Sequence, residues 1–121
     1  GSFRMNCNEL ATAVEYKLPV VICLLNNHVL GMVRQWQTLF YGGRYAYTSI
    51  DRKTDFKALA EAYGAVGINV YRNEDVDDAL KIALATVDRP VLINFEIDSD
   101  DSVLPIVPPG APLDELIEEI P

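Results

Sequence analysis

The stretch from residue 20 to residue 32 constrains the fold of this chain most, because an apolar run ends there in two amides and a glycine. It reads Val-Val-Ile-Cys-Leu-Leu-Asn-Asn-His-Val-Leu-Gly-Met. The apolar part, residues 20–25, predicts a buried strand that ends at Asn26 and Asn27. Open α/β sheets bind ligands beyond the carboxyl ends of their strands, so these amides are candidate ligand contacts. A helix opening at Gly31 would bring backbone N–H groups close to an anion.

Apolar runs alternate with helical patterns along the rest of the chain. The runs cover residues 20–25, 66–70 and 91–97. This alternation predicts parallel strands joined by crossover helices. Because the runs are continuously apolar, we expect helices on both faces of the sheet. The predicted fold is therefore α/β, a three-layer doubly wound and mainly parallel sheet, although three strands make a thin one.

The helical patterns differ in strength. Residues 56–63 carry apolar side chains at i, i+3, i+4 and i+7, with Thr54 or Asp55 as the N-cap and Gly64 as the stop. Weaker apolar stripes predict helices over residues 10–14, 76–84 and 113–120. Each helix would present one apolar face to its neighbours.

Composition and charge exclude several classes of protein. The 121 residues are 50% hydrophobic and 23% charged, which indicates one globular domain with a core. A formal charge of −8 argues against a nucleic-acid-binding surface. Cys7 and Cys23 make no disulfide framework, and Cys23 is expected to be a small hydrophobe inside a strand. No apolar stretch approaches the roughly 18 residues of a membrane span, and no signal peptide is evident, so we expect a cytoplasmic protein without a membrane partner.

Three further stretches carry a resemblance to a known family. Residues 31–33 read Gly-Met-Val, residues 35–41 read Gln-Trp-Gln-Thr-Leu-Phe-Tyr, and residues 103–110 read Val-Leu-Pro-Ile-Val-Pro-Pro-Gly. Together with Asn26 and Asn27, they resemble the C-terminal thiamine-diphosphate-binding domain of acetolactate synthase (acetohydroxyacid synthase) large subunits. The resemblance covers almost the whole chain.

The start of the chain resembles part of a thiamine-diphosphate motif. In that family the motif begins Gly-Asp-Gly and ends, after a helix and a strand, in Asn-Asn. Gly1-Ser2-Phe3 and Asn26-Asn27 stand at the family's spacing, so the chain resembles the motif from just after its aspartate. We therefore expect residues 1–121 to be a C-terminal domain fragment truncated at its N-terminus, with an exposed sheet edge and residues 103–121 as a tail. In the family this tail can fold over the active site and exclude water.

The resemblance implies a role for each residue of the strand end and the following helix. The side chain of Asn27 and the main-chain carbonyl of Val29 would bind Mg²⁺. The implied cofactor-binding residues are Asn26, Asn27, Gly31 and Met32. The implied substrate-channel residues are Met32, Val33, Trp36 and Phe40, of which Trp36 would help to choose the second 2-keto acid.

The residue pattern alone leaves simpler interpretations open. Asn26 and Asn27 can end a strand in a turn that bonds its own backbone. Met32, and Trp36 with Phe40 at i and i+4, can be core residues. His28, the single histidine, lacks the partners of a catalytic triad or metal cluster and is expected to be a loop or surface residue.

The activity that the resemblance implies is the joining of two 2-keto acids with loss of CO2, the first common step of branched-chain amino acid biosynthesis. Pyruvate is the donor and pyruvate or 2-oxobutanoate the acceptor, with thiamine diphosphate and Mg²⁺ as cofactors and FAD bound outside this chain. The family also implies a homodimer or tetramer and a small regulatory subunit. No catalytic residue is expected within the chain, which alone would be inactive.

Two alternatives remain from the sequence. The chain can belong to another thiamine-diphosphate-dependent 2-keto acid decarboxylase or oxidase, which would share Asn26 and Asn27. It can also be a non-catalytic α/β interaction module.

Overall fold

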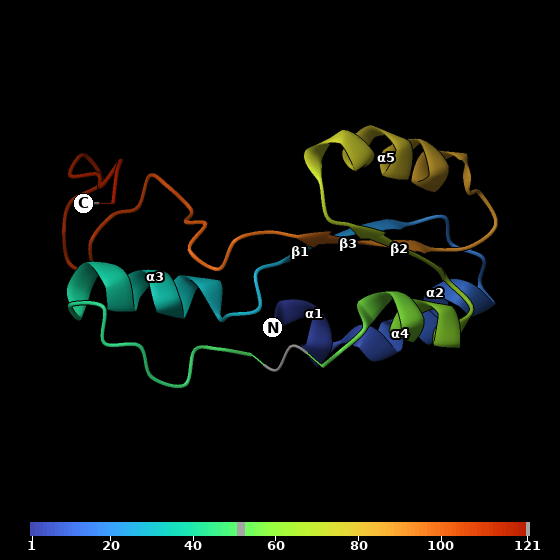
Figure 1. The fold of residues 1–121 in the computed structure, drawn as a ribbon, viewed down its shortest axis with the longest axis horizontal. Helices are drawn as coiled ribbons and strands as arrows, with labels where there is room; N and C mark the ends of the chain where they lie inside the picture. The colour runs from blue at the N-terminus through green and yellow to red at the C-terminus, as the bar shows by residue number, and fades with distance from the viewer. Residues whose placement is uncertain (51–52, 121) are drawn as a thin grey trace.

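Three parallel strands form the middle layer of this protein (Figure 1), whose computed structural model describes residues 1–50 and 53–120. β1 (Val21–Asn26), β2 (Val66–Val70) and β3 (Val91–Glu96) lie in the order β1-β3-β2. Val21 and Val66 are both level with Val91, so the carboxyl ends of the strands meet at one edge of the sheet. The predicted parallel α/β fold is confirmed, with the ends of β1 and β3 differing by one residue from the prediction.

Helices cover both faces of the sheet, and the central strand β3 is buried on both sides. α2 (Leu10–Glu15) and α4 (Phe56–Tyr63) lie on one face, and α5 (Val76–Ala85) lies on the other (Figure 1). On the first face, β3 contributes Leu92 to a cluster with Leu10, Phe56, Ala60 and Ala65. On the α5 face, β3 contributes Val91 and Ile93 to a cluster with Val70, Ala79 and Ala83. The three layers predicted from the continuous apolar runs are therefore present.

The best-defined predicted helix, α4, has the ends that its sequence indicated. Of the two candidate caps, Asp55 accepts a hydrogen bond from the backbone N–H of Ala58 at 3.0 Å. Gly64 ends the helix in the left-handed conformation. α4 lies so close to β2 that a Cβ at Gly67 would meet the Lys57 carbonyl oxygen at 2.5 Å. Only glycine allows this approach of helix to strand.

Strand β1 forms one edge of the sheet and is only partly covered. Ile22 and Leu24 pack toward α2 and α4, whereas Cys23 and Leu25 are exposed on the opposite face. Cys23 thus lies inside a strand, as expected, but its side chain is exposed and does not pack as a small hydrophobe. The physical reason is that the α5 cluster is centred on β2 and β3, so the far half of β1 has no helix above it. The expected exposed edge is present in the described residues.

Helix α3 (Gly31–Phe40) lies beyond the carboxyl edge of the sheet, beside the C-terminal residues (Figure 1). The other described helices are short: α1 (Ser2–Met5), η1 (Cys7–Glu9) and η2 (Asn73–Asp75). Among the residues that the structure describes, no helix is long and apolar enough to cross a bilayer.

The C-terminal helix predicted over residues 113–120 is wrong. Ile106 and Ile117 instead pair in an antiparallel bridge, with their N–H groups donating to each other's carbonyls at 3.0 and 2.8 Å. Leu113 stays exposed. A helix this short is unstable unless it packs on a surface. The backbone N–H and carbonyl of Ile117 instead form their hydrogen bonds with Ile106. Pro121, at the end of the tail assigned to residues 103–121, lies outside the described residues.

The close approach of α4 to β2 makes Gly67→Ala a test of the packing. A Cβ would also lie 2.9 Å from the Cα of Lys57, so backbone must move. We expect the free energy of unfolding to fall by about 1–3 kcal/mol, the usual cost of overpacking a core. Urea unfolding followed by circular dichroism measures it. Ala62→Ser, at an exposed position of the same helix, should unfold like the wild type; equal stability of both variants would contradict the packing argument.

Candidate functional site

The loop after β1 is fixed by its own asparagine side chains. Asn26 Oδ1 accepts a hydrogen bond from the backbone N–H of His28 at 3.4 Å, and Asn27 Oδ1 accepts one from Val29 at 3.3 Å. Within this turn His28 adopts a positive φ of 57°. The turn interpretation is thus present in the structure. Each of these side-chain oxygens can still accept another hydrogen bond or bind a metal ion, because an amide oxygen has a second lone pair.

A second chain segment holds the loop from outside. Val29 and Ser49 form an antiparallel bridge, in which Leu30 N–H donates to the Thr48 carbonyl and Ile50 N–H donates to the His28 carbonyl, both at 2.8 Å. In this pattern the carbonyl of Val29 points away from its bridge partner. The loop therefore turns one main-chain oxygen away from the protein segment that anchors it.

Gly31 allows the loop to fold back on the start of α3. A Cβ at this position would lie 2.8 Å from Asn27 Nδ2. Real Cβ atoms do not come so close, so the Asn27 amide can rest over the helix start only because residue 31 is glycine. The N-terminal N–H groups of a helix attract anions. Asn27, the Val29 carbonyl and the N-terminus of α3 are thus neighbours.

The start of the chain and this loop line one hollow of about 400 Å³. Its walls come from Gly1, Ser2 and Met5 at one side and from residues 29–33 at the other. Figure 1 shows the N-terminus near the carboxyl edge of the sheet, close to where the chain leaves β1 for α3. The start of the chain therefore meets the loop residues that directly follow the two asparagines of the predicted motif.

A second hollow of about 510 Å³ lies along α3. Met32 and Val33 line both hollows, and Trp36, Gln37, Tyr41 and Arg44 complete the second one. Met32 is 53% exposed and Trp36 is 38% exposed, so neither is a core residue here. Phe40 does not line this hollow but packs edge-on against Trp36, with ring centroids 5.8 Å apart.

Sequence reasoning missed Gln37, Tyr41 and Arg44 as lining residues. Gln37 and Tyr41 follow Val33 at i+4 and i+8, so helical spacing could have identified both. Arg44 follows the end of α3 and is brought to the hollow by the turn after Phe40, which no periodic pattern indicated.

A polar cluster occupies the carboxyl ends of the strands beside the loop. Glu96 accepts hydrogen bonds through Oε1 from Asn26 Nδ2 at 3.2 Å and from Asn94 Nδ2 at 2.9 Å, while its Oε2 lies 2.5 Å from His28 Nε2. Asn94 also donates to Asn69 Oδ1 at 3.1 Å. His28 is thus a loop residue, as expected from the sequence, but it is half-buried and pairs with a carboxylate, which the sequence did not indicate.

The carboxylate of Glu96 is held in its charged form. Partial burial raises its pKa, but hydrogen bonds from Asn94 and His28, attraction to His28, and the hydrogen bond from Asn26 together lower it further. The net pKa lies below the ordinary value of a glutamate. Glu96 therefore remains an acceptor for its three neighbours at neutral pH.

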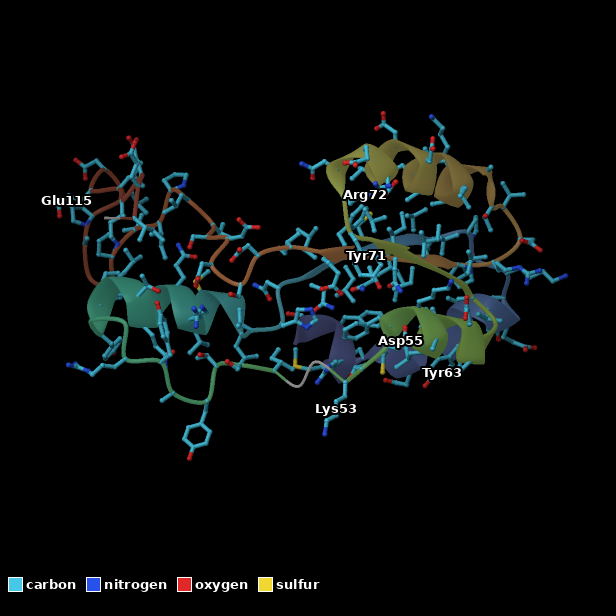
Figure 2. The ribbon with its side chains drawn as sticks, viewed as in Figure 1. Lys53, Asp55, Tyr63, Tyr71, Arg72 and Glu115 are labelled. Atoms are coloured by element: carbon cyan, nitrogen blue, oxygen red, sulfur yellow. The ribbon has the colours of Figure 1, made fainter. Side chains whose placement is uncertain are left out.

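The polar cluster lines a small cavity of about 180 Å³ between the sheet and α4. Figure 2 labels Tyr71, just after β2, and Asp55, at the start of α4, which also line this cavity. Sequence analysis did not single out Asn69, Asn94 or Glu96. Asn94 and Glu96 lie at the carboxyl end of the third predicted strand, and this position in a strand is what singled out Asn26 in the first.

Comparison with known proteins decides the family. A sequence profile described as "Thiamine pyrophosphate enzyme, C-terminal TPP binding domain" matches residues 1–95. The chain belongs to this family. The match includes the two asparagines, Gly31 and all of α3, and ends within β3, so that Glu96 and the C-terminal tail follow it.

Relatives of this TPP-binding domain are acetolactate synthases by name. The chain is 45% identical over 120 residues to a probable acetolactate synthase large subunit of Methanococcus aeolicus, covering 99% of the chain. It is 44% identical to the isozyme 2 large subunit of Escherichia coli, covering 99%, and 41% identical to the Haemophilus influenzae large subunit, covering 97%. The chain spans 20–22% of the length of these curated relatives.

A solved structure has the same fold. The thiamine diphosphate-dependent 4-hydroxybenzoylformate decarboxylase of Rhodococcus jostii RHA1 superposes with a TM-score of 0.75 at 37% identity. The superposition covers 84% of this chain and 19% of that one. The resemblance stated from the sequence, to a thiamine-diphosphate-binding domain, is thereby confirmed.

The tail of this TPP-binding domain is attached to α3 through a buried glutamine. Gln35, only 4% exposed, donates from Nε2 to the Val103 carbonyl at 2.9 Å and accepts from the Val103 N–H at 3.1 Å. Arg34 also pairs with Asp100. These contacts hold the chain after β3 along the same helix whose other residues line the second hollow.

Replacement of Gln35 should release the tail. In Gln35→Leu both hydrogen bonds to Val103 are lost. Hydrogen exchange at the backbone N–H groups of Val103, Leu104, Ile106 and Val107 should become faster by at least about tenfold, as expected for a net loss of about 1.5 kcal/mol or more. Gln35→Glu keeps the acceptor for the Val103 N–H and should give an intermediate rate. Exchange measured by mass spectrometry tests this, and equal protection in Gln35→Leu and the wild type would show that the tail is held by other contacts.

Proposed function

We propose that this chain is the C-terminal cofactor-binding domain of an acetolactate synthase large subunit, an enzyme that joins two 2-keto acids with loss of CO2. The similarity of 41–46% across nearly the whole chain supports this activity. The structural observation that carries the proposal is the hollow in which Gly1 and Ser2 face the loop at residues 29–33. There the start of the chain lies opposite the residues that follow Asn26 and Asn27, the asparagines with which the thiamine-diphosphate motif ends in this family.

The residues around this hollow fit a metal-bound diphosphate. Mg²⁺ prefers hard oxygen ligands, and the Asn27 side-chain oxygen and the Val29 carbonyl are the two neutral oxygens that would bind it. The N-terminal N–H groups of α3, from Gly31 and Met32, would hold diphosphate oxygens. Asn26 supports the loop from the strand side. When bound, thiamine diphosphate supplies the electron sink that decarboxylation of a 2-keto acid requires.

We assign the second hollow to the substrates, pyruvate and the acceptor pyruvate or 2-oxobutanoate. Met32 and Val33 join it to the hollow proposed for the cofactor, so a substrate there would lie beside the cofactor. Trp36 offers an apolar wall, supported edge-on by Phe40. Arg44 offers a guanidinium that can pair with the carboxylate of a 2-keto acid.

The remaining properties belong to the whole enzyme. We propose FAD bound in another domain, a homodimer or tetramer, a small regulatory subunit and a cytoplasmic location, all on resemblance to the acetolactate synthases. The tail attached through Gln35 would help to exclude water from the substrate hollow. Within this proposal the residues of the chain bind and orient, and the group that activates the cofactor comes from elsewhere. The 121-residue chain by itself would therefore be inactive.

Another thiamine-diphosphate-dependent decarboxylase or oxidase is the second candidate, because the Rhodococcus jostii decarboxylase shares the fold at 37% identity. Product analysis of the full-length protein separates the two. Acetolactate from pyruvate supports the synthase, whereas free aldehyde or acetyl phosphate supports the second candidate. The absence of any reaction with cofactors present would favour a non-catalytic module.

Asn27→Ala tests the metal site. Loss of a direct Mg²⁺ ligand should weaken Mg²⁺ binding to the full-length protein by more than the roughly 10–100-fold typical of outer-shell changes. Acetolactate formation should fall with it. The measurement is a Mg²⁺ titration at saturating thiamine diphosphate. Asn8→Ala, at an exposed asparagine near the first turn of the chain, is the matched control; an Asn27→Ala protein with wild-type Mg²⁺ affinity would refute the ligand assignment.

Trp36→Leu tests the substrate hollow. Replacing the indole by the smaller leucine side chain enlarges the hollow. The preference between pyruvate and 2-oxobutanoate as acceptor should therefore change by about tenfold, the scale on which apolar pockets discriminate substrates. Competition between the two acceptors, followed by product ratios, measures it. Tyr16→Leu is the control: Tyr16 is an exposed aromatic residue at the end of α2, and its replacement should leave the ratio unchanged. An unchanged ratio in Trp36→Leu would place the acceptor elsewhere.

A further inference from the structure

The Glu96 carboxylate lies at the centre of the contacts that hold the loop after β1. It is the register partner of Asn26 across the parallel pair of β1 and β3. One carboxylate oxygen accepts from Asn26 and from Asn94, and the other lies against His28. Both oxygens are therefore committed to neighbours. Glu96 itself lines the small cavity beside α4 and contacts the loop from that side.

The contacts of Glu96 fall on the two residues that flank Asn27. Asn26 precedes Asn27 and His28 follows it, and both side chains reach the same carboxylate. Asn26 also accepts from the backbone N–H of His28, which closes the turn. With both neighbours fixed, Asn27 and the peptide that leads to Val29 have little freedom to rotate. The orientation of Asn27 thus depends on a residue that it does not touch.

The support for Glu96 extends into the rigid part of the sheet. Asn94, only 4% exposed, lies on the central strand and binds both Glu96 and Asn69 of β2. A chain of hydrogen bonds therefore runs from β2 through β3 to the end of β1. Networks of this kind in a partly buried setting fix one arrangement, since each member loses partners if another moves.

We infer that Glu96 is a positioning residue for the metal site: its carboxylate holds Asn26 and His28 so that the Asn27 side chain and the Val29 carbonyl face Mg²⁺. This inference rests on the proposed function. Outer-shell partners that orient metal ligands usually matter almost as much as the ligands themselves. A loop that is already ordered gives up less conformational freedom when the metal binds, so its affinity is higher.

The test compares Glu96→Ala with Glu96→Gln in the full-length protein that contains this chain. The main measurement is the Mg²⁺ dissociation constant at saturating thiamine diphosphate, followed by a binding signal and not by turnover. Glu96→Ala removes all three contacts, and we expect it to weaken Mg²⁺ binding by about 10–100-fold. Glu96→Gln keeps an oxygen for Asn26 and Asn94 and an amide that can donate to His28, so it should recover most of that loss.

Two controls separate positioning from general stability. Asp78→Ala removes an exposed carboxylate on α5, paired only with Lys81 in the described contacts, and should bind Mg²⁺ like the wild type. Melting temperatures of the cofactor-free variants show whether each one folds. If Glu96→Ala proves unfolded, Asn94→Leu takes its place, because this change removes the hydrogen bond from Asn94 to the carboxylate. Of the two remaining variants, Asn94→Leu should then bind Mg²⁺ more weakly than the wild type, and Glu96→Gln should not.

The outcomes distinguish this inference from the proposed function. If the wild-type protein shows no Mg²⁺-dependent binding of thiamine diphosphate, the proposed function fails, and the inference fails with it. If the wild type binds and Asn27→Ala does not, the function stands. In that case Mg²⁺ affinity of Glu96→Ala within about twofold of the wild type, or no recovery in Glu96→Gln, overturns the positioning role alone.

Discussion

The burial of β3 on both faces is the constraint on which the rest of this structure depends. Val91, Leu92 and Ile93 are each at most 1% exposed, and they pack alternately against the helices on the two sides. Burial of this kind is the main favourable contribution to folding. Since β1 and β2 both pair with β3 in parallel, its position fixes where the other two strands end. Every part of the candidate site begins at that edge.

Polar residues lie at the carboxyl end of β3, the most deeply buried strand. At this position their side chains need hydrogen-bond partners. Asn94 and Glu96 follow the apolar part of β3, and burial of an unpaired amide or carboxylate would be costly. The Asn94 amide nitrogen and the Glu96 carboxylate are paired with one another and with residues of both neighbouring strands and of the loop, whereas Asn94 Oδ1 has no hydrogen-bond partner among the described residues. The same contacts that relieve this cost also order the loop that carries Asn27. Stability and the geometry of the site therefore share one network.

Helix α3 works differently, because it is not part of the layered core. Its residues Met32, Val33 and Trp36 remain substantially exposed and line hollows, and its buried residue is the polar Gln35, which holds the tail. An apolar helix face without a covering helix costs solvation free energy, and such patches usually mark binding surfaces. In this protein the exposed face continues directly from the loop at the hollow proposed for the cofactor, so the two proposed sites adjoin.

The sequence by itself determined those strands and helices that are indicated by patterns of neighbouring residues. The apolar runs indicated three strands, spacing and caps indicated α4, and Asn26 and Asn27 indicated where the first strand ends, since each signal depends on periodicity or side-chain chemistry nearby. Only the tertiary structure decided the rest. Cys23 is exposed because of where α5 lies, Ile117 pairs with Ile106 in place of the predicted helix, and Glu96 reaches His28, which lies 68 positions earlier in the sequence. These outcomes depend on which surfaces meet after folding, and no local pattern carries that information.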